Sequence, residues 1–344
     1  MKKATSVLKY LAMLGVAVFL LTYALKGYPL ESLLHDMGAV DYRWILLSIA
    51  LAMTSHWLRA YRWNILLRPL GYQNLNSFRT LLCVMSGYLA NLAVPRMGEV
   101  TKCGALRKTD EVPMTTSLGS VVTERFIDLI CLLISLTLTF LVERNRLKDF
   151  SENFIREKMS GLAPLLPYLY WIAAIGFVVA LGGLFFFWKN KKKLRKYPLF
   201  GKAEHIVRQV VDGLLSFRKM KNVPGFLIST TLIWVLYFLM TYVVFFAIPE
   251  TSSLSWGAGL AAFAFGGIAM TAPVSGGIGT YHLIVSAILM LYGVNHQSAL
   301  LYATVMHAAQ TVMTIFFGGI GLFGSIFISK RKKHEQDKHT VENT

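Results

Sequence analysis

The chain has 344 residues, of which 55% are hydrophobic and 15% are charged, whereas a soluble domain carries about 25% charged residues. Its mean hydropathy is +0.51 and apolar runs recur from end to end, which excludes a sizeable soluble domain. The net charge of +17 does not indicate a nucleic-acid partner, because the basic residues are segregated into a few clusters.

The basic clusters lie at residues 2–9, 189–221 and 330–333. Basic short loops mark the cytoplasmic side of a membrane, and anionic inner-leaflet lipid attracts them. We therefore expect a multi-pass protein of the cell (plasma or inner) membrane with both termini in the cytoplasm. The three cysteines are widely spaced, and neither a metal-ligand spacing nor a nucleotide-binding P-loop occurs. No metal and no cofactor are expected.

Spanning helices need about 20 apolar residues, and the sequence predicts about six of them. The first is read as an uncleaved helix, because no signal-peptide cleavage site follows it. The predicted full spans are residues 7–25, 44–66, 117–142, 168–188, 226–248 and 300–328.

Two further apolar segments are broken. Residues 80–94 are short for a crossing and have basic residues at both ends, so a re-entrant hairpin entering from the cytoplasm fits better, with its break at Pro95. Residues 257–293 break at Pro273 and form either two spans or a second hairpin, entering from outside. Paired broken segments of this kind are the best sequence indication of a substrate site near the bilayer midplane.

With two hairpins, the fold class is an all-α polytopic membrane protein with an inverted repeat. One transmembrane domain covers residues 1–329, with repeats at 44–142 and 226–328. Between the repeats lies a basic cytoplasmic loop, 189–225, which is either an amphipathic surface helix or a plain connector. A charged tail, 330–344, is expected to be disordered.

Ionisable residues at membrane depth are costly and usually functional. Arg59 and Arg62 share a helix face near the cytoplasmic end of their span, where they either hold a phosphate or extend to the headgroups. Arg96, Glu99 and Lys102 follow the Pro95 break at the same spacing, and they either contact substrate or face the cytoplasm at a loop. Gly98 among them permits close backbone approach.

The strongest group is Glu124, Arg125 and Asp128, at the start of an otherwise apolar span. Spacings of three and four place them on one face. They form either a structural ion pair or part of a functional site, with Arg96 or Lys102 as further partners.

The candidate residues of the second half are glycines, histidines and a glutamine rather than Arg, Lys, Asp or Glu. Gly276, Gly277 and Gly279 mark its break and His282 follows it, while His307 and Gln310 belong to a polar stripe in the last span. We expect the glycines at 318, 319, 321 and 324 to serve close helix packing.

Four ordered motifs occur along the chain: Leu58 to Leu67, Val94 to Glu99, Ser120 to Asp128, and Ala272 to Gly279. Together they resemble the transmembrane region of bacterial lysylphosphatidylglycerol synthases, a flippase-like membrane family. The chain departs from the family at His282, where Glu is usual, and at Ser275, where a second Pro or Gly is common. The resemblance implies the flipping half of these enzymes without the soluble synthase half.

We therefore expect a non-enzymatic translocator whose partner is a membrane phospholipid or another lipid-linked substrate. Glu124, Asp128 and His282 are its candidate proton-linked groups. One alternative is a transferase acting on a lipid-linked sugar or polyprenyl phosphate. Another is a scaffold for a separate membrane synthase. The sequence indicates neither the lipid, the direction of movement nor the oligomeric state.

Overall fold

A computed structural model describes residues 15–16, 18–26, 28–144, 220–272 and 274–342. Every regular element within these ranges is a helix, in agreement with the predicted all-helical class. The α-helices of the first half are α2 (Leu30–Gly38), α3 (Tyr42–Leu67), α4 (Ser77–Ala93), α5 (Gly98–Asp110) and α6 (Met114–Val142). Those of the second half are α10 (Val223–Tyr242), α11 (Trp256–Ala269), α12 (Thr280–Leu291) and α13 (His296–Glu342).

Three of the described helices are long and apolar enough to cross a membrane, namely Met114–Val142, Val223–Ala247 and His296–Arg331. The segment Tyr42–Leu70 qualifies together with Glu31–Gly38, from which it is bent by 86°. Of the predicted spans, 168–188 lies wholly outside the described residues and 7–25 lies partly outside them. Against the predicted six, the described residues contain three such helices, or four if the bent pair is one span.

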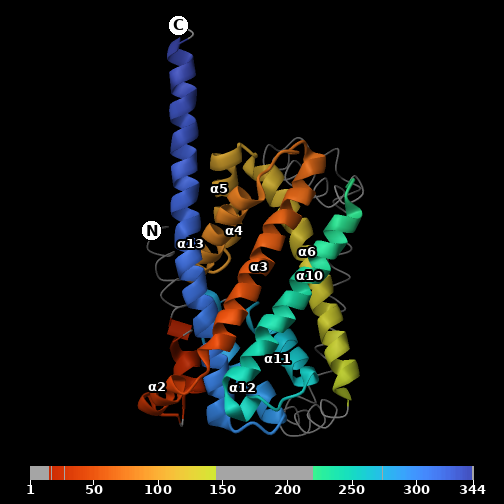
Figure 1. Cartoon of the computed structure of the whole chain (residues 1–344), viewed down its shortest axis with the longest axis vertical. Coiled ribbons are helices and arrows are strands. Elements are labelled where there is room, and N and C mark those ends of the chain that lie inside the picture. Colours follow the sequence, from red (N-terminus) through yellow and green to blue (C-terminus); the bar gives the residue numbers. More distant parts are fainter. Residues whose placement is uncertain (1–14, 17, 27, 145–219, 273, 343–344) are drawn as a thin grey trace, which may run out of the picture.

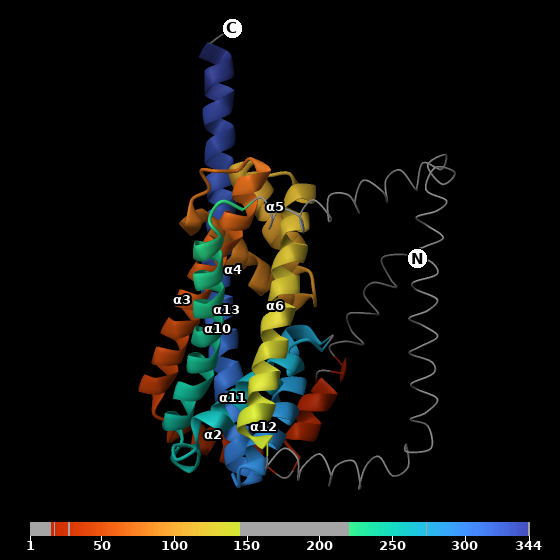
Figure 2. The same ribbon diagram turned by 90° about the vertical axis from the view of Figure 1, so that its right-hand side faces the viewer.

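The short helices form two pairs that enter the bundle from opposite ends. In Figures 1 and 2, α4 runs from the end where α13 projects to about mid-height, and α5 returns to that end. The helices α11 and α12 make the corresponding turn from the other end. We call α4 with α5 the first hairpin and α11 with α12 the second hairpin. The chain breaks at Pro95 in the first, whereas Pro273 lies outside the described residues.

Glycines permit the close crossings that hold the first hairpin. A Cβ atom added at Gly87 of α4 would lie 2.8 Å from the carbonyl oxygen of Gly98 at the start of α5. On α13, an added Cβ at Gly318 would lie 2.7 Å from Leu89 Cβ, and one at Gly321 would lie 2.5 Å from the Leu82 carbonyl oxygen. The expected packing role of the α13 glycines is thus confirmed at these two positions.

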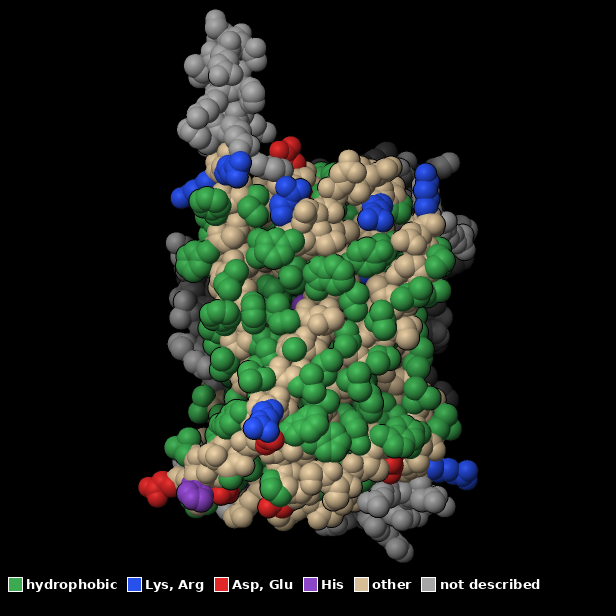
Figure 3. Space-filling model, viewed as in Figure 1, with side chains coloured by type: hydrophobic (Ala, Val, Ile, Leu, Met, Phe, Trp, Pro, Cys, Tyr) green, Lys and Arg blue, Asp and Glu red, His purple; other side chains and the backbone are tan. Residues whose placement is uncertain are grey.

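Apolar side chains cover the middle of the face shown in Figure 3, and most charged side chains lie toward its two ends. At the end where α13 projects, the charged side chains on this face are mainly Lys and Arg. The outer side of α6 is apolar and exposed, as at Leu133, Ile134 and Leu141. Such a surface is suited to lipid rather than water.

Helix α13 continues to Glu342, whereas the sequence predicts a disordered tail from residue 330. Extending an existing helix adds one hydrogen bond per residue without a new nucleation cost. The tail is also rich in Lys, Glu and Gln, which lose little side-chain freedom in a helix.

Candidate functional site

Three helices, α3 and the consecutive pair α5 and α6, bring their ionisable residues together inside the bundle. Helix α3 contributes Arg59 and Arg62, α5 contributes Glu99 and Lys102, and α6 contributes Glu124, Arg125 and Asp128. We call these seven residues the charged cluster. Its four cations exceed its three carboxylates by one.

Glu124 lies at the centre of the charged cluster and is 1% exposed. Its Oε1 lies 2.6 Å from Arg59 Nη2 and 3.0 Å from Arg125 Nη2, while its Oε2 lies 2.9 Å from Lys102 Nζ. A single carboxylate therefore joins all three helices. Lys102 is one of the two partners, with Arg96, that the sequence suggested for this carboxylate.

Asp128 lies one turn along α6 and completes the contact with α3. Its Oδ2 lies 2.8 Å from Arg59 Nη2, and its Oδ1 lies 2.7 Å from Arg62 Nη2. Arg59 also donates through Nη1 to the hydroxyl of Tyr237 on α10, at 2.9 Å. Both arginine side chains are buried. They do not extend to the headgroups, which was one of the two alternatives.

The cluster is costly to bury and is stable only because each charge has close partners. Removing an ion from water costs several kcal/mol, which good geometry and extra hydrogen bonds offset. Lys102 Nζ also lies 4.8 Å from the centre of the Trp63 ring, a favourable cation–π contact. These contacts fix the positions of α3, α5 and α6 relative to one another.

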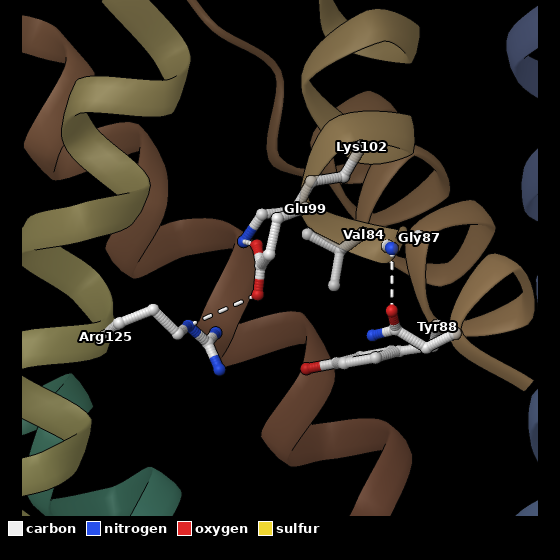
Figure 4. Close-up of a pocket in the computed structure, with 8 residues that line it drawn as sticks. Val84, Gly87, Tyr88, Glu99, Lys102 and Arg125 are labelled. Atoms are coloured by element: carbon white, nitrogen blue, oxygen red, sulfur yellow. Dashed lines mark hydrogen bonds and ion pairs between the residues drawn. The ribbon is translucent and has the colours of Figure 1, made fainter. Parts of the chain in front are cut away.

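Only one cation of the charged cluster is substantially accessible. The Arg125 side chain is 44% exposed and that of Glu99 is 29% exposed, whereas those of Arg59, Arg62 and Lys102 are each 7% exposed or less. Arg125 Nε lies 3.3 Å from Glu99 Oε1, and Figure 4 shows the two side chains reaching toward each other from α6 and α5.

These two residues line a narrow cavity beside the first hairpin. Its volume is about 10 Å³, and its walls are Val84, Gly87, Tyr88, Asn91, Gly98, Glu99, Lys102 and Arg125. A space of this size holds about one water molecule. In the arrangement described, the charged cluster is therefore nearly closed.

Arg96 is separate from the charged cluster. It lies exposed at the tip of the first hairpin, with a left-handed φ of 66° that is uncommon outside glycine. The start of α5 beside it is already capped, because Asn91 Oδ1 accepts from the Gly98 amide at 2.6 Å. The Gly98 amide is therefore already hydrogen-bonded within the protein.

The predicted residues of the second half gather around the break of the second hairpin. Gly276, Gly277 and Gly279 all have left-handed φ, of 59°, 76° and 82°. His307 Nε2 lies 2.8 Å from the Gly276 carbonyl oxygen, and the rings of His282 and His307 have centroids 4.9 Å apart.

Gln310 lies one turn further along α13. Its Nε2 donates to Ser48 Oγ of α3 at 3.3 Å. A Cβ atom added at Gly276 would lie 2.9 Å from Leu92 of α4. The tips of the two hairpins are therefore in contact.

Sequence reasoning missed the aromatic and hydroxyl residues that complete the charged cluster. Tyr237 of α10 bonds Arg59, Thr230 of α10 accepts from Arg62 at 3.4 Å, and Tyr88 of α4 lines the cavity. Single hydroxyl groups are common in apolar spans, so only the packing distinguishes these. Within the described ranges, no three His, Cys, Asp or Glu side chains are grouped to hold a metal ion.

Long apolar helices surrounding a buried charged cluster define a helical membrane protein. The family model described as the lysylphosphatidylglycerol synthase TM region matches residues 10–318. The chain belongs to this family, which confirms the resemblance drawn from its motifs. No curated protein and no solved structure matches the chain.

Proposed function

We propose that this protein moves a phosphate-bearing lipid headgroup between the two leaflets of the cell membrane, without acting as an enzyme. The observation that carries the proposal is the charged cluster. It carries an excess positive charge inside a bundle whose outer surface suits lipid, and it opens only at Arg125 and Glu99. Membership of a family concerned with a membrane lipid supports the same substrate class.

The opposed hairpins support an inverted repeat, 44–142 against 226–328. Each repeat holds a long helix, a hairpin from one end and a second long helix in return (Figures 1 and 2). Repeats of this kind place a substrate site at their interface and alternate its access between the two sides. Leu92 of the first hairpin packs against Gly276 of the second in the arrangement described.

Within this proposal the residues divide into two groups. Arg59, Arg62 and Lys102 are buried and paired with carboxylates, and they hold the helices together. Arg125 binds the phosphate, because a guanidinium holds phosphate oxygens in pairs and this one is exposed. Arg96, at the hairpin tip near mid-height, is the next cation on the path.

Orientation follows from charge. Arg107 and Lys108 occupy the last turn of α5, and Lys330 and Arg331 follow the last apolar run of α13. Both groups lie at the end from which α13 projects (Figure 1). We assign this end to the cytoplasm, where the anionic inner leaflet attracts basic residues.

Translocation is tested with the purified chain in liposomes that contain headgroup-labelled phospholipids. A membrane-impermeant quencher reports the fraction of label in the outer leaflet over time. We expect faster exchange than in empty liposomes, and a fall of about 10- to 100-fold in Arg125→Gln, because a hydrogen bond to a charged group contributes about 1.5–3 kcal/mol. Exchange as slow as in empty liposomes across a broad lipid panel would refute the proposal.

Arg107→Gln is the matched control. Arg107 is an exposed arginine of α5 outside the charged cluster, so its loss should leave the rate within about twofold of the unmodified protein. Arg125→Lys keeps the charge and removes the paired geometry, and an intermediate rate is expected.

The transferase alternative makes a different prediction in the same preparation. Purified protein incubated with a labelled lipid-linked sugar would form product. The scaffold alternative predicts that Arg125→Gln leaves function intact. The accessible Arg125 favours translocation over scaffolding, because an inert scaffold does not require a partly exposed cation beside a buried charged cluster.

A further inference from the structure

The second hairpin contains a pair of buried histidines that the charged cluster does not use. His282 lies in the first turn of α12 and His307 lies on α13, and they are 4% and 9% exposed. Their ring centroids are 4.9 Å apart with planes at 56°. They lie at the break of the second hairpin, where Gly276 also contacts the first hairpin.

The hydrogen bond of His307 fixes the position of one proton. Its Nε2 lies 2.8 Å from the carbonyl oxygen of Gly276. A carbonyl oxygen only accepts, so Nε2 carries the hydrogen. In the neutral ring Nδ1 is then bare and available for a second proton.

His282 contributes an unused nitrogen. Its Nδ1 is buried and has no hydrogen-bond partner. Buried polar atoms are nearly always paired, so an unpaired one requires an explanation. A nitrogen left open beside a second imidazole is suited to binding a proton.

The groups around the pair leave the two imidazoles as the proton acceptors. From α12 the facing titratable group is Tyr281, with its ring 5.5 Å from His307. Tyr302 of α13 donates its hydroxyl hydrogen to the Thr241 carbonyl oxygen. The 3₁₀ turn Ser275–Gly277 contributes the Gly276 carbonyl, and α4 contributes Leu92.

No ion pair between described residues includes His282 or His307. The candidate carboxylates Glu124 and Asp128 are bonded to arginines instead.

We propose that His282 and His307 together form a binding site for one proton at the break of the second hairpin. A hydronium ion gives its proton to a bare imidazole nitrogen, an N–H bond forms, and water leaves. The pair gains one positive charge. A second proton is opposed by the first, because two like charges within about 5 Å repel strongly in a low-dielectric interior.

Access of water determines when the proton binds. Burial disfavours the charged ring, so the pair is neutral in the closed arrangement described. When the second hairpin moves away from α13, water reaches the rings and the proton binds. Proton binding thereby favours the open position of this hairpin, whichever lipid is moved.

The test uses the full chain in phospholipid nanodiscs with ¹⁵N-labelled histidine. Imidazole nitrogen shifts are followed between about pH 5 and 8, the range in which histidine ordinarily titrates. We expect signals of both rings to move together in one transition. In His282→Gln, and in a second variant His282→Asn, the proton affinity of His307 should change at least tenfold.

Two other histidines provide controls. His35 has an 88% exposed side chain, and His56 on α3 is partly buried and contacts the Tyr88 ring. His35→Gln and His56→Gln should leave the shared transition unchanged. Independent titration of the two rings, or the absence of titration by both, would overturn the proton site. Because this experiment requires no transported lipid, such a failure is distinct from a failure of translocation.

Discussion

Arg59 and Glu124 are 65 residues apart in the sequence, and Arg59 Nη2 lies 2.6 Å from Glu124 Oε1 inside the bundle. The same guanidinium reaches Asp128 one turn along α6 and Tyr237 on α10. Arg59 therefore makes a contact with each of two neighbouring helices, and its position depends on both. This pairing gives the charged cluster a structural role that is separable from substrate binding.

Replacing Glu124 by Gln should strongly destabilise the protein. The change removes the shared acceptor of Arg59, Lys102 and Arg125, and breaking a buried ion pair costs roughly 3–5 kcal/mol. Thermal unfolding of the purified protein in detergent should show a clearly lower midpoint. Glu31→Gln, at an exposed position of α2, should behave as the unmodified protein. Equal midpoints for the two variants would contradict the central role of Glu124.

Replacing Gly98 by Ala should separate the two helices of the first hairpin. The added methyl group would overlap the Gly87 carbonyl oxygen and the Asn91 side chain, and overpacking of this kind costs about 1–3 kcal/mol. Gly104→Ala on the same helix is the control, since no atom lies within 4 Å of its added Cβ. It should gain up to about 1 kcal/mol from helix propensity. Protease sensitivity of the α4–α5 connection reports the difference, and equal sensitivity would argue against this crossing.

Replacing Gly321 by Ala should loosen α13 from α4. Its added Cβ would lie 2.5 Å from the Leu82 carbonyl oxygen, whereas an added Cβ at Gly319 meets nothing within 4 Å. We expect a lower melting midpoint for Gly321→Ala alone. Both residues lie in the interior of the same helix, so the gain in helix propensity from Gly to Ala is the same in both variants and cancels in the comparison. A loss of stability in Gly319→Ala instead would mean that another face of α13 contacts α4.

Topology is testable by labelling single cysteines in intact cells, in a background without Cys83, Cys103 and Cys131. Arg107→Cys, in the last turn of α5, should resist impermeant thiol reagents because that end of the bundle is assigned to the cytoplasm. Ser252→Cys, at an exposed position between α10 and α11, should label readily because α10 ends at the opposite end. Labelling of Arg107→Cys from outside would reverse the orientation and the direction assigned to both hairpins.

The all-helical class and the positions of the broken segments were accessible from the sequence, because apolar length and breakpoints are local properties. The predicted segment 80–94 corresponds to α4, Ser77–Ala93, and the helix resumes at Gly98 after Pro95. The segment 257–293 contains two short helices around the three left-handed glycines. Pattern and backbone chemistry are sufficient for elements of this kind.

Partner choice inside the charged cluster was not accessible in the same way. Spacing placed Glu124 and Asp128 on one face of a helix, but it could not show that Arg59 and Arg62 of α3 meet them. The sequence also left Arg96 as a possible partner, and the structure places it elsewhere. Pairing between helices depends on how they pack, and a single sequence does not encode that packing in any local pattern.

Helix α13 packs against α4 and α5 of the first hairpin and against α12 of the second. One continuous helix therefore supports both hairpins of the proposed path. A rigid tilt of α13 displaces its contacts with both hairpins in the same movement. We therefore expect α13 to couple the movements of the two hairpins, and such coupling favours opening one side at a time over a continuous pore.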